Sequence, residues 1–310
     1  MKEYLSHTWQ DPNTQFDSAL GWSPIPNRRI NYPNWGLLSS NSHGFRSAEI
    51  NQNKKQIIIL GDSVAWGAGV SDTETFPHYL EEMVSRLGYQ VSNLAVSGYD
   101  LGQYYLFLKK HINKFKNLKQ VILVICTHND LQCTGRNVCY GKRKPLFVLK
   151  NDDLILTNND IKKYCLRNLF SKSYFLSKFT QHECYIGTLL SQISGDQILG
   201  PSESEQISLT LLQKIYELVL NHNAELLVVL RPTRDDFIKK SPSLEWFEHI
   251  FHKVKTKSLN YIDYIETLKE EKDLNDLYLD KDVAHFSKNG NLVLAKTVYE
   301  YLDMRLKNTP

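Results

Sequence analysis

The sequence predicts an α/β fold, a three-layer α/β/α sandwich around a mostly parallel five-stranded sheet. Two features of the chain lead to this prediction. Five apolar runs have the length of strands, at residues 57–60, 91–96, 120–126, 225–230 and 259–265. Helical patterns follow these runs. They lie at 75–87, in a segment after the second strand that ends at about residue 116, and at 208–220, 244–254 and 291–302. Strands that alternate with helices pair in parallel through crossovers, and this arrangement builds a doubly wound sheet.

The first strand and the helix after it carry clear local signals. Residues 57–60 read Ile-Ile-Ile-Leu, which is typical of a strand buried on both faces. In the helix at 75–87, Thr75 suits the N-cap, Pro77 the first turn, and Gly88 the position after the end. These signals set the boundaries of the first strand–helix unit.

Composition and charge exclude several classes of protein. Of the 310 residues, 42% are hydrophobic and 23% are charged, which is ordinary for a globular domain. The net charge of +3 and the lack of a long Lys/Arg block argue against a nucleic-acid partner. No apolar run has the length of a transmembrane segment, and the first residues show no secretory signal. We therefore expect a cytoplasmic protein, or a periplasmic or secreted one if a leader has been removed.

The five cysteines are Cys126, Cys133, Cys139, Cys165 and Cys184. Cys126 lies in an apolar run and is expected in the core. The other four are compatible with free thiols, which we favour, or with disulfides, of which Cys133–Cys139 would close a short loop. A zinc site is disfavoured because the chain contains no C-x-x-C pair.

The chain divides into an arm and a body. Residues 1–50 are rich in Pro, Asn, Ser and Trp and lack periodicity, so we expect an extended arm packed on the body. Residues 51–310 carry the strands and helices of one domain. Within it, residues 131–206 break the rhythm with a basic turn, an alternating run that suggests a hairpin, and an aromatic segment. An insertion after the carboxyl end of a strand lies where open α/β sheets bind ligands, so we interpret it as a cap or lid.

Chemically useful residues follow three of the predicted strands and precede the last helix. Ser63 ends the run QIIILGDS, Gly98 follows the second strand, and Asn129 follows the third. Asp282 and His285 come just before the closing helix. Because parallel strands end at one edge of a sheet, we expect these residues to meet there. Together they supply a nucleophile, oxyanion donors, and a general base with an orienting carboxylate.

This set, in this order, resembles the GDSL/SGNH hydrolase family. The four signature positions of that family, Ser, Gly, Asn and His, match Ser63, Gly98, Asn129 and His285. The stretches GDSVAWGAGVSDTETFPHYLEE, NLAVSGYDLGQ and DKDVAHFSKNGNLVLAKTVYEYL resemble three of its blocks, and LGWSPIPN and NSHGFRS in the arm are similar to bacterial members. The resemblance covers most of the chain and is weakest across residues 155–205.

The resemblance implies a flavodoxin-like SGNH hydrolase fold and a serine esterase that needs no metal or organic cofactor. Ser63 would be the nucleophile, His285 the general base, and Asp282 the carboxylate that orients it. The backbone N–H groups of Ser63 and Gly98, with the amide of Asn129, would form the oxyanion hole. A competing candidate for the orienting acid, Asp280, is weaker because of its longer spacing from the histidine.

Three further residues are candidates for the substrate pocket. Trp66 and Tyr99 follow Ser63 and Gly98 closely in the sequence, and each either shapes the acyl pocket or packs in the core. Thr127 stands where the family usually has glycine, two positions before Asn129, and a bulkier residue there would narrow the pocket.

The resemblance leaves the substrate open among small-molecule, glycan and lipid esters, O-acetyl esters included. Two alternatives to hydrolysis also stay open. An O-acyltransferase would use the same triad with a sugar hydroxyl in place of water, and a non-catalytic carbohydrate- or lipid-binding module would keep only the fold. The sequence does not indicate the oligomeric state.

Overall fold

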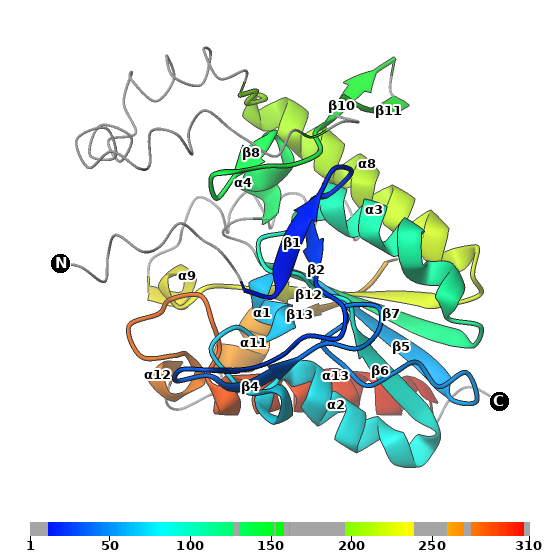
Figure 1. The fold of residues 1–310 in the computed structure, drawn as a ribbon, viewed down its shortest axis with the longest axis vertical. Coiled ribbons are helices and arrows are strands. Elements are labelled where there is room, and N and C mark those ends of the chain that lie inside the picture. The colour runs from blue at the N-terminus through cyan, green and yellow to red at the C-terminus, as the bar shows by residue number, and fades with distance from the viewer. Residues whose placement is uncertain are drawn as a thin grey trace.

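The computed structural model describes residues 12–126, 130–151, 153–157, 161, 196–238, 259–269 and 274–306. Among these residues, five strands form a parallel sheet in the order β13-β12-β7-β5-β6 (Figure 1). The strands are β5 (Lys55–Leu60), β6 (Tyr89–Asn93), β7 (Leu118–Cys126), β12 (Glu225–Arg231) and β13 (Asn260–Asp263). Counted along the chain and read from the β6 edge, this order is 2-1-3-4-5, which is the flavodoxin-like order. The predicted fold class is confirmed.

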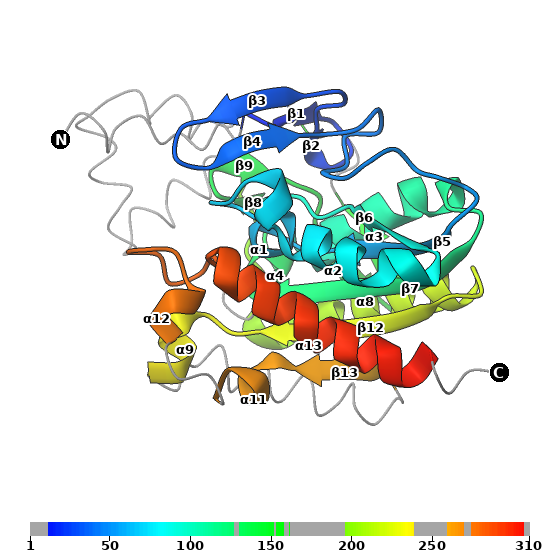
Figure 2. The ribbon, with the colours of Figure 1, turned by 90° about the horizontal axis from the view of Figure 1, so that it is seen from below.

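Helices cover both faces of the sheet, as Figure 2 shows. α2 (Phe76–Val84) and α13 (Lys288–Leu306) share one hydrophobic cluster, and α3 (Leu101–His111) and α8 (Pro201–Leu220) share the other. Successive residues of β5 alternate between the two clusters, so the strand is apolar on both faces. The shorter helical segments are α1 (Ser63–Trp66), α4 (Asp130–Thr134), α9 (Arg234–Ile238), α11 (Tyr264–Lys269) and α12 (Leu274–Leu277), with 3₁₀ turns at Asp72–Glu74, Ser85–Leu87 and Ile112–Lys114.

The helix boundaries follow the local signals closely. The Thr75 side chain accepts a hydrogen bond from the backbone N–H of His78, and Gly88 takes a left-handed φ of 79° where the helix unit ends. α8 begins earlier than predicted because Pro201 suits the first helical position, where its missing N–H is not needed. The predicted helix at 244–254 lies outside the described residues.

The arm is more ordered than the sequence indicates. Instead of running as an extended arm, residues 12–50 contain two antiparallel hairpins, β1–β2 (Thr14–Asp17, Gly21–Pro24) and β3–β4 (Arg29–Tyr32, Gly36–Ser39). The side chain of Asp17 closes the first loop by accepting two backbone N–H groups. The division of the chain at residue 50 stays a prediction.

The arm packs on the body through buried aromatic residues. Trp22 is 3% exposed, and its indole N–H donates to the carbonyl oxygen of Ser97 over 3.0 Å. Phe45 enters the same hydrophobic cluster as α3 and stacks near Phe115. The arm thereby contacts the loop that follows β6.

The insertion at 131–206 is described in part. After α4 come two short hairpins, β8–β9 (Val138–Cys139, Lys142–Arg143) and β10–β11 (Phe147–Lys150, Asp153–Leu156). The hairpin predicted from the alternating run is confirmed as β10–β11. The role of the insertion as a cap stays a prediction, because residues 162–195 lie outside the described part.

The structure joins Cys133 of α4 to Cys139 of β8 by a disulfide. The prediction of free thiols is wrong for this pair. The α4–β8 connection brings the two Cα atoms within 5.8 Å of each other, which is a distance that a disulfide spans. Cys126 is buried, as expected. Cys165 and Cys184 lie outside the described residues.

A buried histidine marks the packing of the arm on α3. The ring of His111, the last residue of α3, lies 5.1 Å from that of Phe45 and 4.5 Å from that of Phe107. Burial, helped by the positive charges of Lys110 and Lys114, lowers the pKa of His111 to about 4. The folded protein therefore holds this imidazole neutral.

This arrangement predicts a loss of stability in mild acid. An unfolded histidine has a pKa of about 6.5, so between roughly pH 6.5 and 4 the unfolded state binds a proton that the folded state does not. The contribution of the neutral His111 to the free energy of unfolding is therefore complete above that window, and it is lost as the pH falls through the window. His111→Phe removes this contribution, so its melting temperature should decline less from pH 7 to 4.5 than that of the wild type. Parallel declines would contradict the assignment.

Candidate active site

Ser63 lies just after β5, in a turn that requires glycine. A Cβ on Gly61 would lie 2.9 Å from the carbonyl oxygen of Val124 in β7, closer than real Cβ atoms approach. Asp62 is the N-cap of α1, and its side chain accepts a hydrogen bond from the backbone N–H of Val64 over 2.9 Å. In Gly-Asp-Ser, glycine thus permits the turn, aspartate caps the helix, and serine begins it.

The structure brings Ser63, His285 and Asp282 into one chain of hydrogen bonds. Nε2 of His285 lies 2.8 Å from Oγ of Ser63, and Nδ1 lies 2.7 Å from Oδ2 of Asp282. Ser63 is separated from His285 by 222 positions in the sequence. Since the carboxylate can only accept, Nδ1 carries a proton and Nε2 is left to accept from the serine hydroxyl.

The second carboxylate oxygen of Asp282 holds the turn that carries the histidine. Oδ1 accepts from the backbone N–H groups of Ala284 and His285 over 2.7 and 2.9 Å. Burial alone would raise the pKa of Asp282, but the hydrogen bonds and charge of His285 outweigh it and hold the pKa well below its ordinary range. Asp282 is therefore ionised at neutral pH. Asp280 is exposed and 3.9 Å from Lys281.

Two of the three predicted oxyanion donors lie in the described part of the chain. Among those residues, no acceptor is found for the backbone N–H of Ser63 or of Gly98. The N–H of Val96 donates to Gly61, which sets the loop with Gly98 beside the turn with Ser63. Gly98 has a φ of 76°, a conformation that favours glycine. Asn129 and Thr127 lie outside the described residues.

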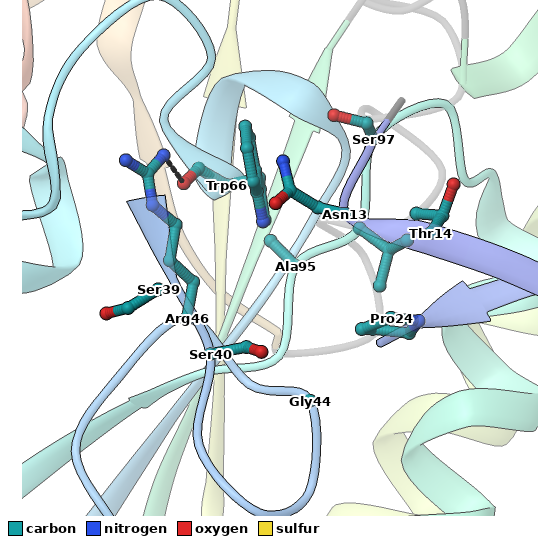
Figure 3. Close-up of a pocket in the computed structure, with 11 residues that line it drawn as sticks. Asn13, Thr14, Pro24, Ser39, Ser40, Gly44, Arg46, Trp66, Ala95 and Ser97 are labelled. Atoms are coloured by element: carbon teal, nitrogen blue, oxygen red, sulfur yellow. Dashed lines mark hydrogen bonds between the residues drawn. The ribbon is translucent and has the colours of Figure 1, made fainter. Parts of the chain in front are cut away.

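Trp66, the last residue of α1, lines a small pocket between the arm and the body (Figure 3). The cavity volume is about 10 Å³, which is room for about one water molecule. The lining residues are Asn13, Thr14, Pro24, Ser39, Ser40, Gly44, Arg46, Trp66, Ala95, Val96 and Ser97. Arm residues thus close against the segments that carry Ser63 and Gly98.

Tyr99 belongs to the core instead of the pocket. Its side chain is 1% exposed and packs edge-on against Phe107, and its hydroxyl donates to the carbonyl oxygen of Trp22 over 2.6 Å. Of the two roles that the sequence leaves open for Tyr99, the structure shows the core role. The sequence left both open because the position after a strand end does not say which way a side chain points.

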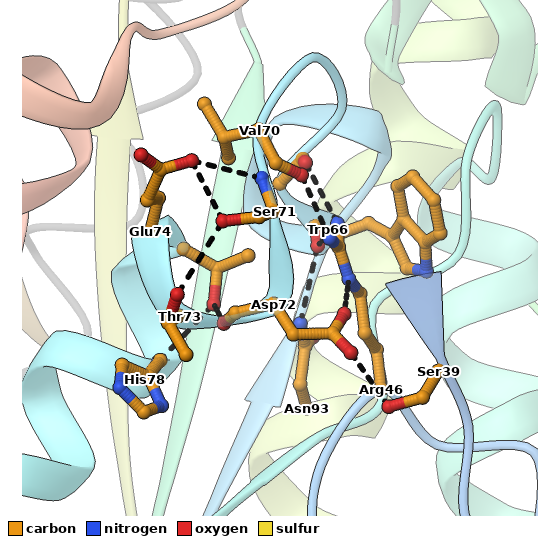
Figure 4. Close-up of polar contacts among 12 residues, drawn as sticks. Ser39, Arg46, Trp66, Val70, Ser71, Asp72, Thr73, Glu74, His78 and Asn93 are labelled. Carbon is orange, nitrogen blue, oxygen red and sulfur yellow. Dashed lines mark hydrogen bonds and ion pairs between the residues drawn. The ribbon is translucent and has the colours of Figure 1, made fainter. Parts of the chain in front are cut away.

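Arg46 of the arm is a contributor to the site that the sequence analysis did not single out. Its Nη1 donates to the carbonyl oxygens of Trp66 and Gly67 over 3.1 and 2.7 Å, and its Nη2 donates to that of Val70 over 2.8 Å (Figure 4). Nε pairs with Asp72 at 2.8 Å. A cation at the carboxyl end of a helix satisfies carbonyls that have no partner within the helix. Arg46 therefore holds the end of the helix that Ser63 begins.

Buried ionisable groups tie neighbouring strand ends together. Arg231, the last residue of β12, donates to Sγ of Cys126 over 3.6 Å, and its guanidinium lies 4.4 Å from the ring centre of Phe286. Asp130 accepts the backbone N–H of Cys126 over 2.9 Å, and burial raises its pKa well above the ordinary value. These contacts join the ends of β7 and β12 to the residue after the histidine.

The described residues hold no group of three or more His, Cys, Asp or Glu side chains that could bind a metal ion. In the same part of the chain, no helix is long and apolar enough to cross a membrane.

Comparison of the sequence with protein families and with curated proteins finds no match. Among solved structures, the chain is partly similar to a member of the lipolytic protein G-D-S-L family from Veillonella parvula DSM 2008, at 12% identity, with a TM-score of 0.47 over 79% of this chain and 97% of that one. The lipase/acylhydrolase from Enterococcus faecalis is 12% identical, with a TM-score of 0.46 over 81% of this chain and 96% of that one. The psychrotrophic esterase EstA from Pseudoalteromonas sp. is 11% identical to this chain. The two superpose with a TM-score of 0.46 over 82% of this chain and 100% of that one. Since these TM-scores lie below 0.5, the likenesses carry no argument about activity.

The contacts of Arg46 predict a large loss of stability when its side chain is removed. Arg46→Ala takes the cationic partner from the partly buried Asp72 carboxylate and one donor from each of three carbonyl oxygens, which should cost about 3 kcal/mol of unfolding free energy. Arg28→Ala, at an exposed arginine of the same arm, is the control and should cost little. Urea unfolding measures both free energies. Equal losses of stability in the two variants would show that the contacts of Arg46 with Asp72 and the three carbonyl oxygens do not stabilise the fold.

Proposed function

We propose that this protein is a serine ester hydrolase of the GDSL/SGNH type, which cleaves a carboxylic ester through an acyl-serine intermediate. The observation that carries the proposal is the hydrogen-bonded chain from Oγ of Ser63 through His285 to Asp282, at the carboxyl edge of a doubly wound sheet. A serine hydroxyl is a weak nucleophile unless a base takes its proton during attack, and the 2.8 Å hydrogen bond between Nε2 of His285 and Oγ of Ser63 supports that role for the histidine.

In the acylation step, Oγ of Ser63 attacks the ester carbonyl carbon while its proton moves to Nε2 of His285. The tetrahedral intermediate then collapses, the bond to the alcohol oxygen breaks, and His285 gives its proton to the departing alcohol. Water attacks the acyl-serine in the second step, with His285 again as the base. The second tetrahedral intermediate collapses, the bond between the acyl carbon and Oγ of Ser63 breaks, and His285 gives Oγ the proton that it took from water, so the carboxylic acid leaves and the free serine is restored.

Asp282 supports both steps by orienting the imidazole and stabilising its protonated form. Its carboxylate accepts a hydrogen bond from the Nδ1–H of His285, and this contact keeps Nε2 available to the serine. Because its pKa is held well below the ordinary range, the carboxylate stays ionised while His285 shuttles the proton. Asp282 therefore needs no protonation change during the cycle.

The negative charge of the tetrahedral intermediate would be received by the backbone N–H groups of Ser63 and Gly98 together with the Asn129 amide. The absence of other acceptors for the two backbone N–H groups among the described residues supports this role. Loss of a single oxyanion donor typically raises the barrier by about 3–4 kcal/mol. Gly98 suits this position because its φ of 76° is a backbone conformation that favours glycine.

The proposal predicts which substitutions abolish ester cleavage. On p-nitrophenyl acetate, Ser63→Ala should reduce kcat to background, and Asp282→Asn should reduce it about 1,000- to 10,000-fold because the amide no longer fixes the tautomer. Stopped-flow or steady-state release of p-nitrophenol measures both effects.

Asp280→Asn is the matched control, since Asp280 is a neighbouring carboxylate exposed to solvent. It should leave kcat within twofold of the wild-type value. Full activity in Ser63→Ala, or equal losses in the two aspartate variants, would contradict the assignment of the triad.

A further inference from the structure

Tyr140 occupies a turn that disfavours it. The hairpin β8–β9 pairs Cys139 with Lys142, which leaves Tyr140 and Gly141 as a two-residue loop. Both loop residues have positive φ angles, 51° and 71°, as a type I′ turn requires. Asn-Gly is the preferred sequence for such a turn, and a bulky residue in the left-handed region is strained by roughly 1 kcal/mol or more. Contacts or a function outside the turn must therefore offset the strain of an aromatic residue at this position.

The hairpin that carries Tyr140 is anchored on both of its strands. On β8, Cys139 is bonded to Cys133 of α4. Just after β9, Nζ of Lys144 lies 2.7 Å from Oδ2 of Asp100, and both side chains are almost fully buried. Asp100 in turn caps α3, two residues after Gly98 in the sequence. The tip of the hairpin is thus held against the loop that follows β6.

The ring of Tyr140 lies on Gly98. A Cβ built on Gly98 would meet two ring atoms of Tyr140 at 3.2 and 3.4 Å, and the indole of Trp22 at 3.5 Å. Trp22 is buried, whereas Tyr140 is 42% exposed. An exposed aromatic ring therefore stands directly beside the proposed oxyanion donor.

The order of the strands indicates which part of an ester this ring would meet. His285 approaches Ser63 from the β12 side, because the N–H of Arg234, just after β12, donates to Val283 over 2.8 Å. Gly98 follows β6, on the opposite side of β5. The leaving alcohol must reach the proton on His285, so the oxyanion and the acyl group occupy the two remaining corners of the tetrahedral carbon, on the side of Gly98 and Tyr140. The oxyanion meets the N–H of Gly98, and the acyl group lies next to it, where the ring of Tyr140 stands.

We propose that Tyr140 is a specificity-determining residue that forms the wall of the acyl site and limits the enzyme to esters of short-chain acids such as acetate. The inference rests on the proposed function and adds its substrate class. A short acyl chain gains apolar contact with the ring, while a longer chain meets a wall that the disulfide and the buried ion pair prevent from moving.

The test is the acyl-chain preference of two variants at this position. Tyr140→Asn removes the ring and places the favoured residue in the turn, so it should be at least as stable as the wild type in thermal unfolding. Its ratio of kcat/KM for p-nitrophenyl octanoate over acetate should rise at least tenfold. Tyr140→Phe keeps the ring and should keep the wild-type ratio.

Ile155→Asn removes an exposed apolar side chain from the neighbouring hairpin β10–β11 and serves as the matched control. It should not change the ratio. A series of acetate esters that differ only in their alcohol tests the leaving-group side of the site separately from the acyl side. Across this series, the relative kcat/KM values of Tyr140→Asn should match those of the wild type.

The outcomes separate the two proposals. If the wild type cleaves esters and Tyr140→Asn keeps its acyl preference, or changes only its preference among alcohols, the acyl-wall inference is overturned and the esterase proposal stands. If neither protein cleaves any ester, the esterase proposal fails and the inference fails with it. A shift in acyl preference confined to Tyr140→Asn supports both.

Discussion

The turn after β5 is the constraint on which the site depends. β5 is buried on both faces, so the chain has to leave the sheet abruptly, and the close approach of Val124 admits only glycine at position 61. Asp62 then caps α1, and Ser63 begins it, within hydrogen-bonding distance of His285. A side chain at position 61 would push the serine away from the histidine. The rest of the site is built around this short segment.

A helix of four residues has no stability of its own, so both ends of α1 need outside partners. Asp62 supplies the partner at the amino end, and Arg46 supplies it at the carboxyl end from the arm. The arm also reaches the loop after β6 through the bond from Trp22 to Ser97. Segments far apart in the sequence therefore hold the two loops that carry the proposed nucleophile and oxyanion donor.

The sequence predicts the sheet and the meeting of Ser63, Asp282 and His285 because both follow from local rules. Apolar runs of strand length indicate the strands, and parallel strands end at one edge. The role of Arg46, the Cys133–Cys139 bond and the hairpins of the arm could not be predicted in this way. Each depends on contacts between distant segments, and no local spacing indicates which carbonyl, sulfur or strand will be the partner.

The most direct test of the account is intact-mass analysis after treatment with a fluorophosphonate, followed by peptide mapping. The hydrogen bond from Ser63 to His285 predicts one adduct per chain, located on Ser63, with much slower labelling in His285→Ala. Absence of an adduct in the folded wild type, or an adduct on another residue, would contradict the central claim that Ser63 is an activated nucleophile.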